Sequence, residues 1–169
     1  MFSNKIICEI INYIDVNLNS KITIDDIENK VFYNKFYIVK LFKKEIGYTI
    51  FDYINHLRID NSIYDISNSS KSFTRIALDN GFYSLEYFSE TFKKIVGVSP
   101  RIYKKYLEYN NDLDEDTKFL IRDNLIKIND LISYRDKYLS NIKPVYIPVK
   151  KLTIFKWLLV FTLLFYFLL

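Results

Sequence analysis

The stretch GFYSLEYFSETFKKIVGVSP, Gly81–Pro100, decides the fold of this chain, because part of it occurs twice. A shift of 50 residues places LFKKEIGYT, which starts at Leu41, on TFKKIVGVS, which starts at Thr91. Each block closes a unit made of a short helix, a turn and a longer helix, and a glycine, Gly47 or Gly97, stops the longer helix. The internal repeat therefore predicts two copies of one helical unit.

Apolar residues at helical spacing, with capping residues such as Thr23, Asn34 and Ser84 before them, predict helices throughout this region. They are expected at about 4–18, 24–31, 35–46, 50–66, 73–80, 84–95 and 100–109. In the helix at 50–66, which joins the repeats, the core candidates are Ile50, Phe51, Ile54, Leu57 and Tyr64. In the repeats, the predicted core consists of Ile27, Ile38, Leu41, Phe42, Ile76, Ala77, Phe82, Phe88, Phe92 and Val96. The expected fold class is all-α, with two helix-turn-helix subdomains joined by a long linker helix and about seven helices in all.

Composition excludes several classes of function. The 169 residues contain one cysteine, Cys8, and one histidine, His56, so an internal disulfide, a zinc finger and most nucleophile–histidine pairs are excluded by count. No set of nucleophile, base and orienting group can be assembled, so no enzyme, catalytic residue, metal site or cofactor is expected. The net charge of +4, from 24 basic and 20 acidic residues, permits a nucleic-acid partner without requiring one.

Helix-turn-helix units have a characteristic use. The second helix enters the major groove of DNA, and its N-terminal turns face the base edges. Two units on one linker helix could read two successive major-groove segments about 34 Å apart on one side of the duplex. A single chain would then recognise a bipartite DNA site.

The segment Gly81–Pro100 resembles the signature of the AraC/XylS transcription regulators, and Tyr33–Ile59 looks like their first unit with the start of the linker helix. The resemblance covers about residues 6–107 and implies an AraC-type double helix-turn-helix domain at 4–109 that binds promoter DNA in a sequence-specific way. Double-stranded DNA is the implied partner, and RNA polymerase is a further candidate. The DNA-contacting residues that the resemblance implies are Asn34, Lys35, Phe36, Val39 and Lys40 in the first unit and Ser84, Leu85, Glu86, Tyr87 and Glu90 in the second.

Basic residues further along these helices suit the phosphate backbone. Lys43 and Lys93 lie one helical turn beyond the predicted reading positions and are expected to contact phosphates, which supply affinity rather than sequence information. Further phosphate candidates are Arg58, Lys44, Lys94, Arg101 and Lys104.

Three positions depart from the family pattern. Glu28 stands where the family usually has a small alanine, and it would need a partner if buried. Glu86 and Glu90 stand where the family often has glutamine and a basic residue. A carboxylate can accept a hydrogen bond from cytosine N4, but it repels phosphate. The alternative function is therefore an interaction module that keeps the fold, does not read DNA, and binds a membrane or a protein partner.

Residues 110–141 predict a helical stalk. Ile121, Leu125, Ile128, Ile132 and Leu139 follow alternating steps of four and three, and Arg135 occupies the remaining position of the pattern. This spacing is typical of a short coiled coil, so a homodimer through 118–139 is a candidate. A basic linker with two prolines follows at 142–151.

The last 18 residues, LTIFKWLLVFTLLFYFLL at 152–169, predict a transmembrane helix in contact with lipid. A helix of this length spans roughly 27 Å. Lysines 150, 151 and 156 lie toward its N-terminal side, so we expect a single-pass membrane protein with its DNA-binding domain in the cytoplasm. The alternative is an apolar tail that packs on the protein or in a dimer. A third interpretation is that the sequence belongs to a longer sensor that continues past Leu169.

Overall fold

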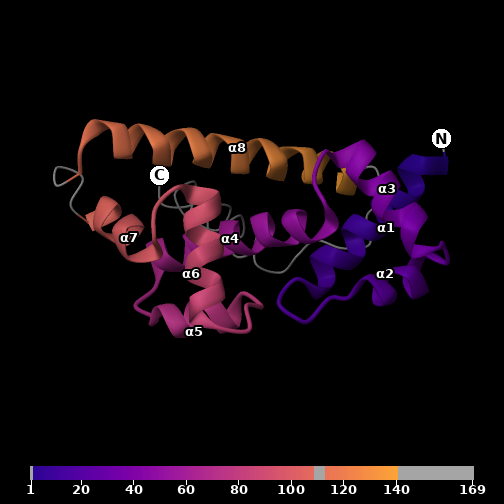
Figure 1. Cartoon of the computed structure of the whole chain (residues 1–169), viewed down its shortest axis with the longest axis horizontal. Helices are drawn as coiled ribbons and strands as arrows, with labels where there is room; N and C mark the ends of the chain where they lie inside the picture. The colour runs from indigo at the N-terminus through magenta and orange to yellow at the C-terminus, as the bar shows by residue number, and fades with distance from the viewer. Residues whose placement is uncertain (1, 109–112, 141–169) are drawn as a thin grey trace, which may run out of the picture. The chain divides into compact units, whose positions relative to one another are not determined.

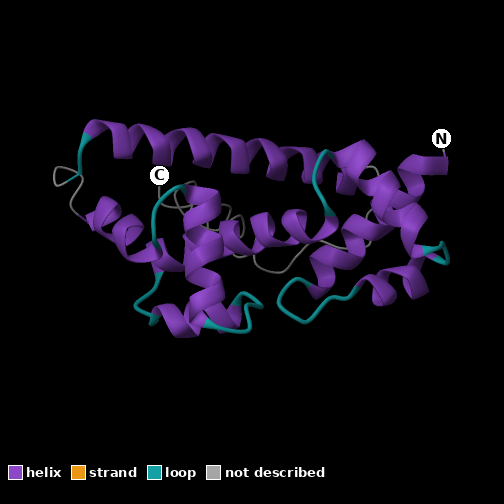
Figure 2. Cartoon of the chain, in the orientation of Figure 1, coloured by secondary structure: helices purple, strands orange, loops and turns teal. Residues whose placement is uncertain are grey.

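The computed structural model describes residues 2–108 and 113–140, and these residues form eight α-helices and no strand (Figures 1 and 2). The helices are α1 (Phe2–Asn17), α2 (Ile24–Val31), α3 (Lys35–Ile46), α4 (Ile50–Asn68), α5 (Phe73–Asp79), α6 (Leu85–Val96), α7 (Pro100–Glu108) and α8 (Glu115–Ser140). The boundaries of α1–α7 agree with the predicted ones to within two residues. The all-α prediction is confirmed.

Local side-chain chemistry explains where these helices begin and end. Thr23 and Asp26 form a capping box at the start of α2: the Thr23 backbone N–H donates to the Asp26 carboxylate at 2.8 Å, and the Asp26 N–H donates to Thr23 Oγ1 at 3.2 Å. Hydrogen bonds from the Thr23 side chain and backbone lower the pKa of Asp26. Gly47 and Gly97 follow α3 and α6 with φ of 85° and 93°, a left-handed conformation that glycine adopts without steric cost.

Two hydrophobic clusters form the core, and α4 belongs to both. The first cluster joins α1, α2 and α3 to the beginning of α4. The second joins the rest of α4 to α5, α6 and α7. All ten residues predicted for the core of the repeats are buried. We refer to α2–α3 as the first unit and to α5–α6 as the second unit.

Two core predictions on the linker helix are wrong. Phe51 and Tyr64 expose half or more of their surface, although Ile50, Ile54 and Leu57 are buried. The reason is that α4 buries one face in the first cluster, through Ile50, Ile54 and Leu57, and a different face in the second, through Ile59 and Ile66. A single apolar stripe therefore does not describe this helix.

The predicted stalk is a helix, α8, but it packs on both clusters (Figure 1). Ile121 and Ile128 are buried in the second cluster, and Leu131 is buried in the first. Leu125, Ile132 and Leu139 are partly buried against the same clusters. The apolar residues of 118–139 thus pack against the two clusters of the same chain. The buried residues of this face are therefore covered within the chain, and a homodimer through 118–139 stays a prediction.

The predicted membrane localisation is also wrong. None of the helices within 2–108 and 113–140 combines the length and the apolar character that crossing a membrane requires. The predicted transmembrane segment, 152–169, and the predicted linker, 142–151, lie outside the described residues.

Candidate nucleic-acid interface

The short helix α2 holds the first turn of α3. A helix leaves its first backbone N–H groups without partners inside the helix. The Asn34 side chain accepts from the Phe36 N–H at 2.9 Å, and Glu28 Oε1 accepts from the Lys35 N–H at 3.0 Å. Lys35 also forms an ion pair of 3.3 Å with Asp25. Glu28, the departure from the family pattern, thus has a partner and places the start of α3 relative to α2.

The outer face of α3 carries four of the predicted contact residues. Phe36 and Val39 expose 77% and 44% of their surface, and Lys40 and Lys43 are exposed beside them. The opposite face of the helix is buried in the first cluster through Ile38, Leu41 and Phe42. Of the other predicted residues, Asn34 serves as the N-cap and Lys35 is engaged with Asp25. The first two turns of α3 therefore present an apolar and cationic surface.

Helix α6, which the sequence predicts to be the second reading helix, places its predicted contact residues differently from α3. Ser84 is the N-cap and accepts from the Tyr87 N–H at 3.1 Å. Leu85 and Tyr87 are partly buried against the second cluster. The Tyr87 hydroxyl accepts from Asn55 Nδ2 on α4 at 3.0 Å, and its ring stacks on Tyr83 at 4.8 Å. Ser84, Leu85 and Tyr87 thus hold the start of α6 in place.

Charged side chains make up the exposed part of α6. Glu86, Glu90, Lys93 and Lys94 all face solvent, and Lys94 lies 3.8 Å from Asp52. The sequence of α3 holds four lysines and one glutamate, whereas that of α6 holds two of each. No ion pair links Lys40, Lys43 or Lys93 to another of the described residues. These three ammonium groups are accordingly available to phosphates.

Arg58 is a structural residue, although the sequence suggested a phosphate contact. From α4 its guanidinium donates to the Leu18 carbonyl at 2.9 Å and to the Ser20 carbonyl at 2.7 Å. It also lies 5.9 Å from the centre of the Phe82 ring, and burial lowers the pKa of Arg58. A Cβ on Gly81 would lie 2.8 Å from the Leu18 carbonyl oxygen and 3.1 Å from Arg58. Arg58 therefore ties the end of α1 to the turn of the second unit.

Helix α8 contacts the C-terminal ends of both reading helices. Asn124 Nδ2 donates to the Val96 carbonyl, in the last turn of α6, at 3.2 Å. The Tyr134 hydroxyl donates to the Glu45 carbonyl, in the last turn of α3, at 3.5 Å. Both acceptors belong to the last turns, whose carbonyls a helix leaves unpaired. The N-terminal turns of α3 and α6 lie at the opposite ends of these helices.

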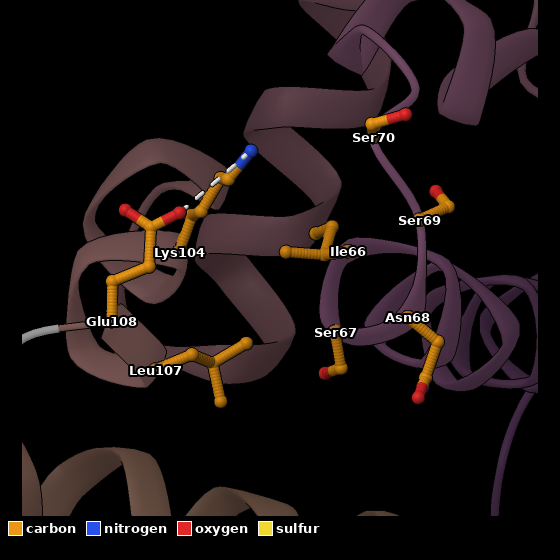
Figure 3. Close-up of a pocket in the computed structure, with 8 residues that line it drawn as sticks. All are labelled: Ile66, Ser67, Asn68, Ser69, Ser70, Lys104, Leu107 and Glu108. Carbon is orange, nitrogen blue, oxygen red and sulfur yellow. Dashed lines mark ion pairs between the residues drawn. The ribbon is translucent and has the colours of Figure 1, made fainter.

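A shallow pocket between the end of α4 and α7 has a different character (Figure 3). Its lining consists of Ile66, Ser67, Asn68, Ser69, Ser70, Lys104, Leu107 and Glu108. Lys104, a predicted phosphate contact, lies 3.9 Å from Glu108 there. Within 2–108 and 113–140, no group of histidine, cysteine and carboxylate side chains is arranged to hold a metal ion. Asp26 instead belongs to the capping box of α2, and Asp114 accepts from the Thr117 N–H at the start of α8.

Comparisons with known proteins agree with this geometry. A helix-turn-helix domain family matches residues 28–106. The TetD protein of transposon Tn10 from Escherichia coli is 33% identical over 104 residues, which cover 62% of this chain and 75% of TetD. The HTH-type transcriptional activator AarP from Providencia stuartii is 31% identical over 112 residues, or 66% of this chain and 83% of AarP.

A solved structure shows the same arrangement of helices. It is a transcriptional regulator from Chromobacterium violaceum, described among AraC-type DNA-binding domain-containing proteins, with a TM-score of 0.58 and 25% sequence identity. The match covers 63% of this chain and 96% of that structure. The family match, at residues 28–106, runs from the middle of α2 into α7.

Proposed function

The chain belongs to the AraC/XylS family of transcription regulators, and we propose that it reads two successive major-groove segments of one DNA duplex with α3 and α6. The observation that supports this proposal most directly is the pairing of two units of the same design on one helix, α4. Each reading helix is capped at its start, buries one face and leaves the other to solvent. This is what a helix needs in order to lie in a groove.

Charge favours DNA over the alternative of a module that does not read it. Phosphate neutralisation by lysine and arginine supplies most of the affinity of DNA-binding proteins. Lys40 and Lys43 on α3 and Lys93 on α6 are exposed and unpaired among the described side chains. On α6, Glu86 and Glu90 would face base edges, where a carboxylate accepts from cytosine N4. The second segment of the site is thus expected to contain cytosine.

A gel-shift experiment tests this function. The full chain is mixed with a pool of random-sequence duplexes over a range of salt concentrations. Binding is expected to weaken as salt rises, and Lys40→Ala and Lys93→Ala are each expected to reduce the log–log salt slope by about 0.9. Lys127→Ala, on the exposed side of α8, is the matched control and should leave the slope unchanged. Failure to retain any DNA even at low salt would contradict the proposal and favour the protein-binding alternative.

RNA polymerase is the protein partner that this function suggests. The relative AarP is named a transcriptional activator, and an activator acts on transcription from a nearby promoter. We expect the full chain, added to a promoter that carries its selected site, to increase transcript yield in a purified transcription assay. Decreased yield would identify a repressor instead.

A further inference from the structure

The exposed surface of α3 contains an apolar pair that the fold does not use. Phe36 and Val39 are three residues apart, so they lie on one face of the helix, one above the other. Phe36 exposes 77% of its surface, although its neighbour Ile38 is fully buried. Neither side chain can donate or accept a hydrogen bond. Their contribution to recognition must therefore come from apolar contact.

The major groove offers one apolar group for such contact. Thymine carries a C5-methyl group at its major-groove edge, whereas the other groups that specify a base pair there are hydrogen-bond donors and acceptors. Apolar side chains recognise this methyl by direct packing. We propose that Phe36 and Val39 read thymine methyl groups, so that the first segment of the DNA site has thymines at the two contacted positions. This inference rests on the proposed function, because it takes α3 to lie in a major groove.

The spacing of the pair suits neighbouring base pairs. An α-helix rises about 1.5 Å per residue, so Phe36 and Val39 are separated by about 4.5 Å along α3. Successive bases of one strand lie about 3.4 Å apart along the duplex. The two side chains can thus reach methyl groups on adjacent thymines, a contact that side chains two full turns apart could not make.

Charge around the pair selects a nucleic acid over an apolar protein surface. Lys40 and Lys43 lie at four and seven residues from Phe36, on the same side of the helix, and both are exposed. No acidic residue occupies the first turn of α3. DNA matches this arrangement. The lysines can bind its phosphates, and the apolar pair can contact thymine methyl groups in the major groove.

The fold holds the pair in a fixed orientation. Glu28 and Asn34 accept from the backbone N–H groups of Lys35 and Phe36, so the first turn of α3 is tied both to α2 and to its own N-cap. Preorganised contacts lose less entropy on binding than mobile ones. The backbone that carries Phe36 is therefore already fixed before DNA binds, which lowers the entropy lost on binding.

Deoxyuridine provides a direct test, since it differs from thymidine only by lacking the C5-methyl. Duplexes bound by the full chain are first selected from a random pool, and each thymidine of the preferred site is then replaced singly by deoxyuridine. We expect at least one replacement to lower the affinity about fourfold, the value of one buried methyl group. With Phe36→Ala, the same replacement should have no effect. Phe119→Ala on α8, where the ring is 66% exposed, is the matched control and should keep the fourfold loss.

The outcomes separate this inference from the function on which it rests. If the chain selects a DNA site but no deoxyuridine penalty is removed by either Phe36→Ala or Val39→Ala, the reading of methyl groups by α3 is overturned and the proposed function stands. If the chain selects no DNA at any salt concentration, both are overturned, and the apolar pair would belong to a protein interface. The first deoxyuridine series uses the unaltered protein, so a series without any penalty overturns the inference whether or not a variant folds.

Discussion

The two helix-turn-helix units contain nine-residue blocks of similar sequence, yet they turn the chain differently between their helices. In the first unit, α2 ends at Phe32, a non-glycine residue with φ of 57°, whose N–H donates to the Glu28 carbonyl at 2.9 Å. In the second unit the left-handed residue is Gly81, and the Phe82 N–H donates back to the Ala77 carbonyl at 3.0 Å. These are the two common ways to end a helix, a single bond from the left-handed residue and a Schellman motif.

Two residues separate the left-handed Gly81 from the next N-cap, Ser84, whereas one separates Phe32 from Asn34. The longer turn places a phenylalanine, Phe82, in the core. Phe82 is buried, with its ring 5.2 Å from that of Phe88 and beneath Arg58. The first turn has no such ring, and Phe32 exposes 90% of its surface. The first unit closes its turn with the carboxylate of Glu28 instead. The same repeat is thus held by apolar packing in one unit and by a charge-assisted hydrogen bond in the other.

The largest expected difference concerns the two phenylalanines of the turns. Phe82→Ala removes a ring that is 98% buried, judged from its 2% exposure, and should lower the free energy of unfolding by about 3–5 kcal/mol. Phe32→Ala removes an exposed ring and should change it by less than about 0.5 kcal/mol. Urea unfolding of the full chain followed by circular dichroism measures both. Equal effects would show that the two turns do not differ in packing.

The two glycines that end the reading helices should differ as well. Both have positive φ, so alanine at Gly47 should cost about 1–2 kcal/mol from the backbone alone. A Cβ on Gly97 would also lie 2.8 Å from Leu120 Cγ and 3.0 Å from the Asn124 amide of α8, whereas nothing lies within 4 Å at Gly47. We therefore expect Gly97→Ala to cost about 1 kcal/mol more than Gly47→Ala.

The same unfolding experiment measures the glycine pair, with unfolding midpoints compared at a constant slope against urea. An equal cost for Gly97→Ala and Gly47→Ala would mean that α8 does not press on the end of α6. A larger cost at Gly47 would reverse the comparison and place the tighter contact in the first unit.

The sequence predicted what depends on local chemistry. The helix boundaries, the caps at Asn34 and Ser84 and the ten core residues of the repeats follow from apolar spacing and short-range hydrogen bonds, and all are confirmed. The predicted stripe on 50–66 misplaced Phe51 and Tyr64, because α4 serves two cores with two faces. The sequence predicted the apolar face of α8 but not the two clusters that cover it, because an amphipathic pattern does not specify which surface packs against it.

In the candidate site too, the features that depend on local sequence could be predicted, and those that depend on tertiary contacts could not. Asn34 and Ser84 could be placed at helix starts from the sequence, and the exposed positions of α3 follow from its buried ones. The bonds of Arg58 to carbonyls about 40 residues away, and the contact of Tyr87 with Asn55, depend on tertiary structure. The spacing of residues in the sequence does not predict such contacts. For this reason, the sequence alone could not distinguish residues that support the site from residues that would contact DNA. Which of the twelve residues contact bases stays a prediction.

Helix α8 also forms a partly buried ion pair with α1, and this offers a smaller test. Its Arg135 lies 3.5 Å from Asp15 of α1, and the two side chains expose only 16% and 19% of their surface. Arg135→Met leaves Asp15 without this partner in a partly buried position and should cost about 1–2 kcal/mol of unfolding free energy. Arg122→Met is the matched control, because Arg122 pairs with Glu115 at 3.9 Å and both side chains expose more than half of their surface, so the substitution should cost less than about 0.5 kcal/mol. Equal costs would show that the ion pair between α8 and α1 adds nothing to the apolar contacts of α8.

The smallest expected difference lies at Glu28 and at its counterpart 50 residues later, Leu78. Glu28→Ala leaves the Lys35 N–H without its acceptor and removes a negative charge from the positive end of α3, which should cost about 1 kcal/mol. Leu78 is half exposed, so Leu78→Ala should cost less than about 0.5 kcal/mol. Glu28→Gln keeps an acceptor oxygen and loses only the charge, so its cost should fall between those of the other two variants. Thermal unfolding at low and high salt distinguishes the two contributions, because screening weakens the charge and leaves the hydrogen bond. A cost for Glu28→Ala as small as that for Leu78→Ala would mean that Asn34 alone fixes the start of α3, and the two turns would then differ only in the packing of Phe82.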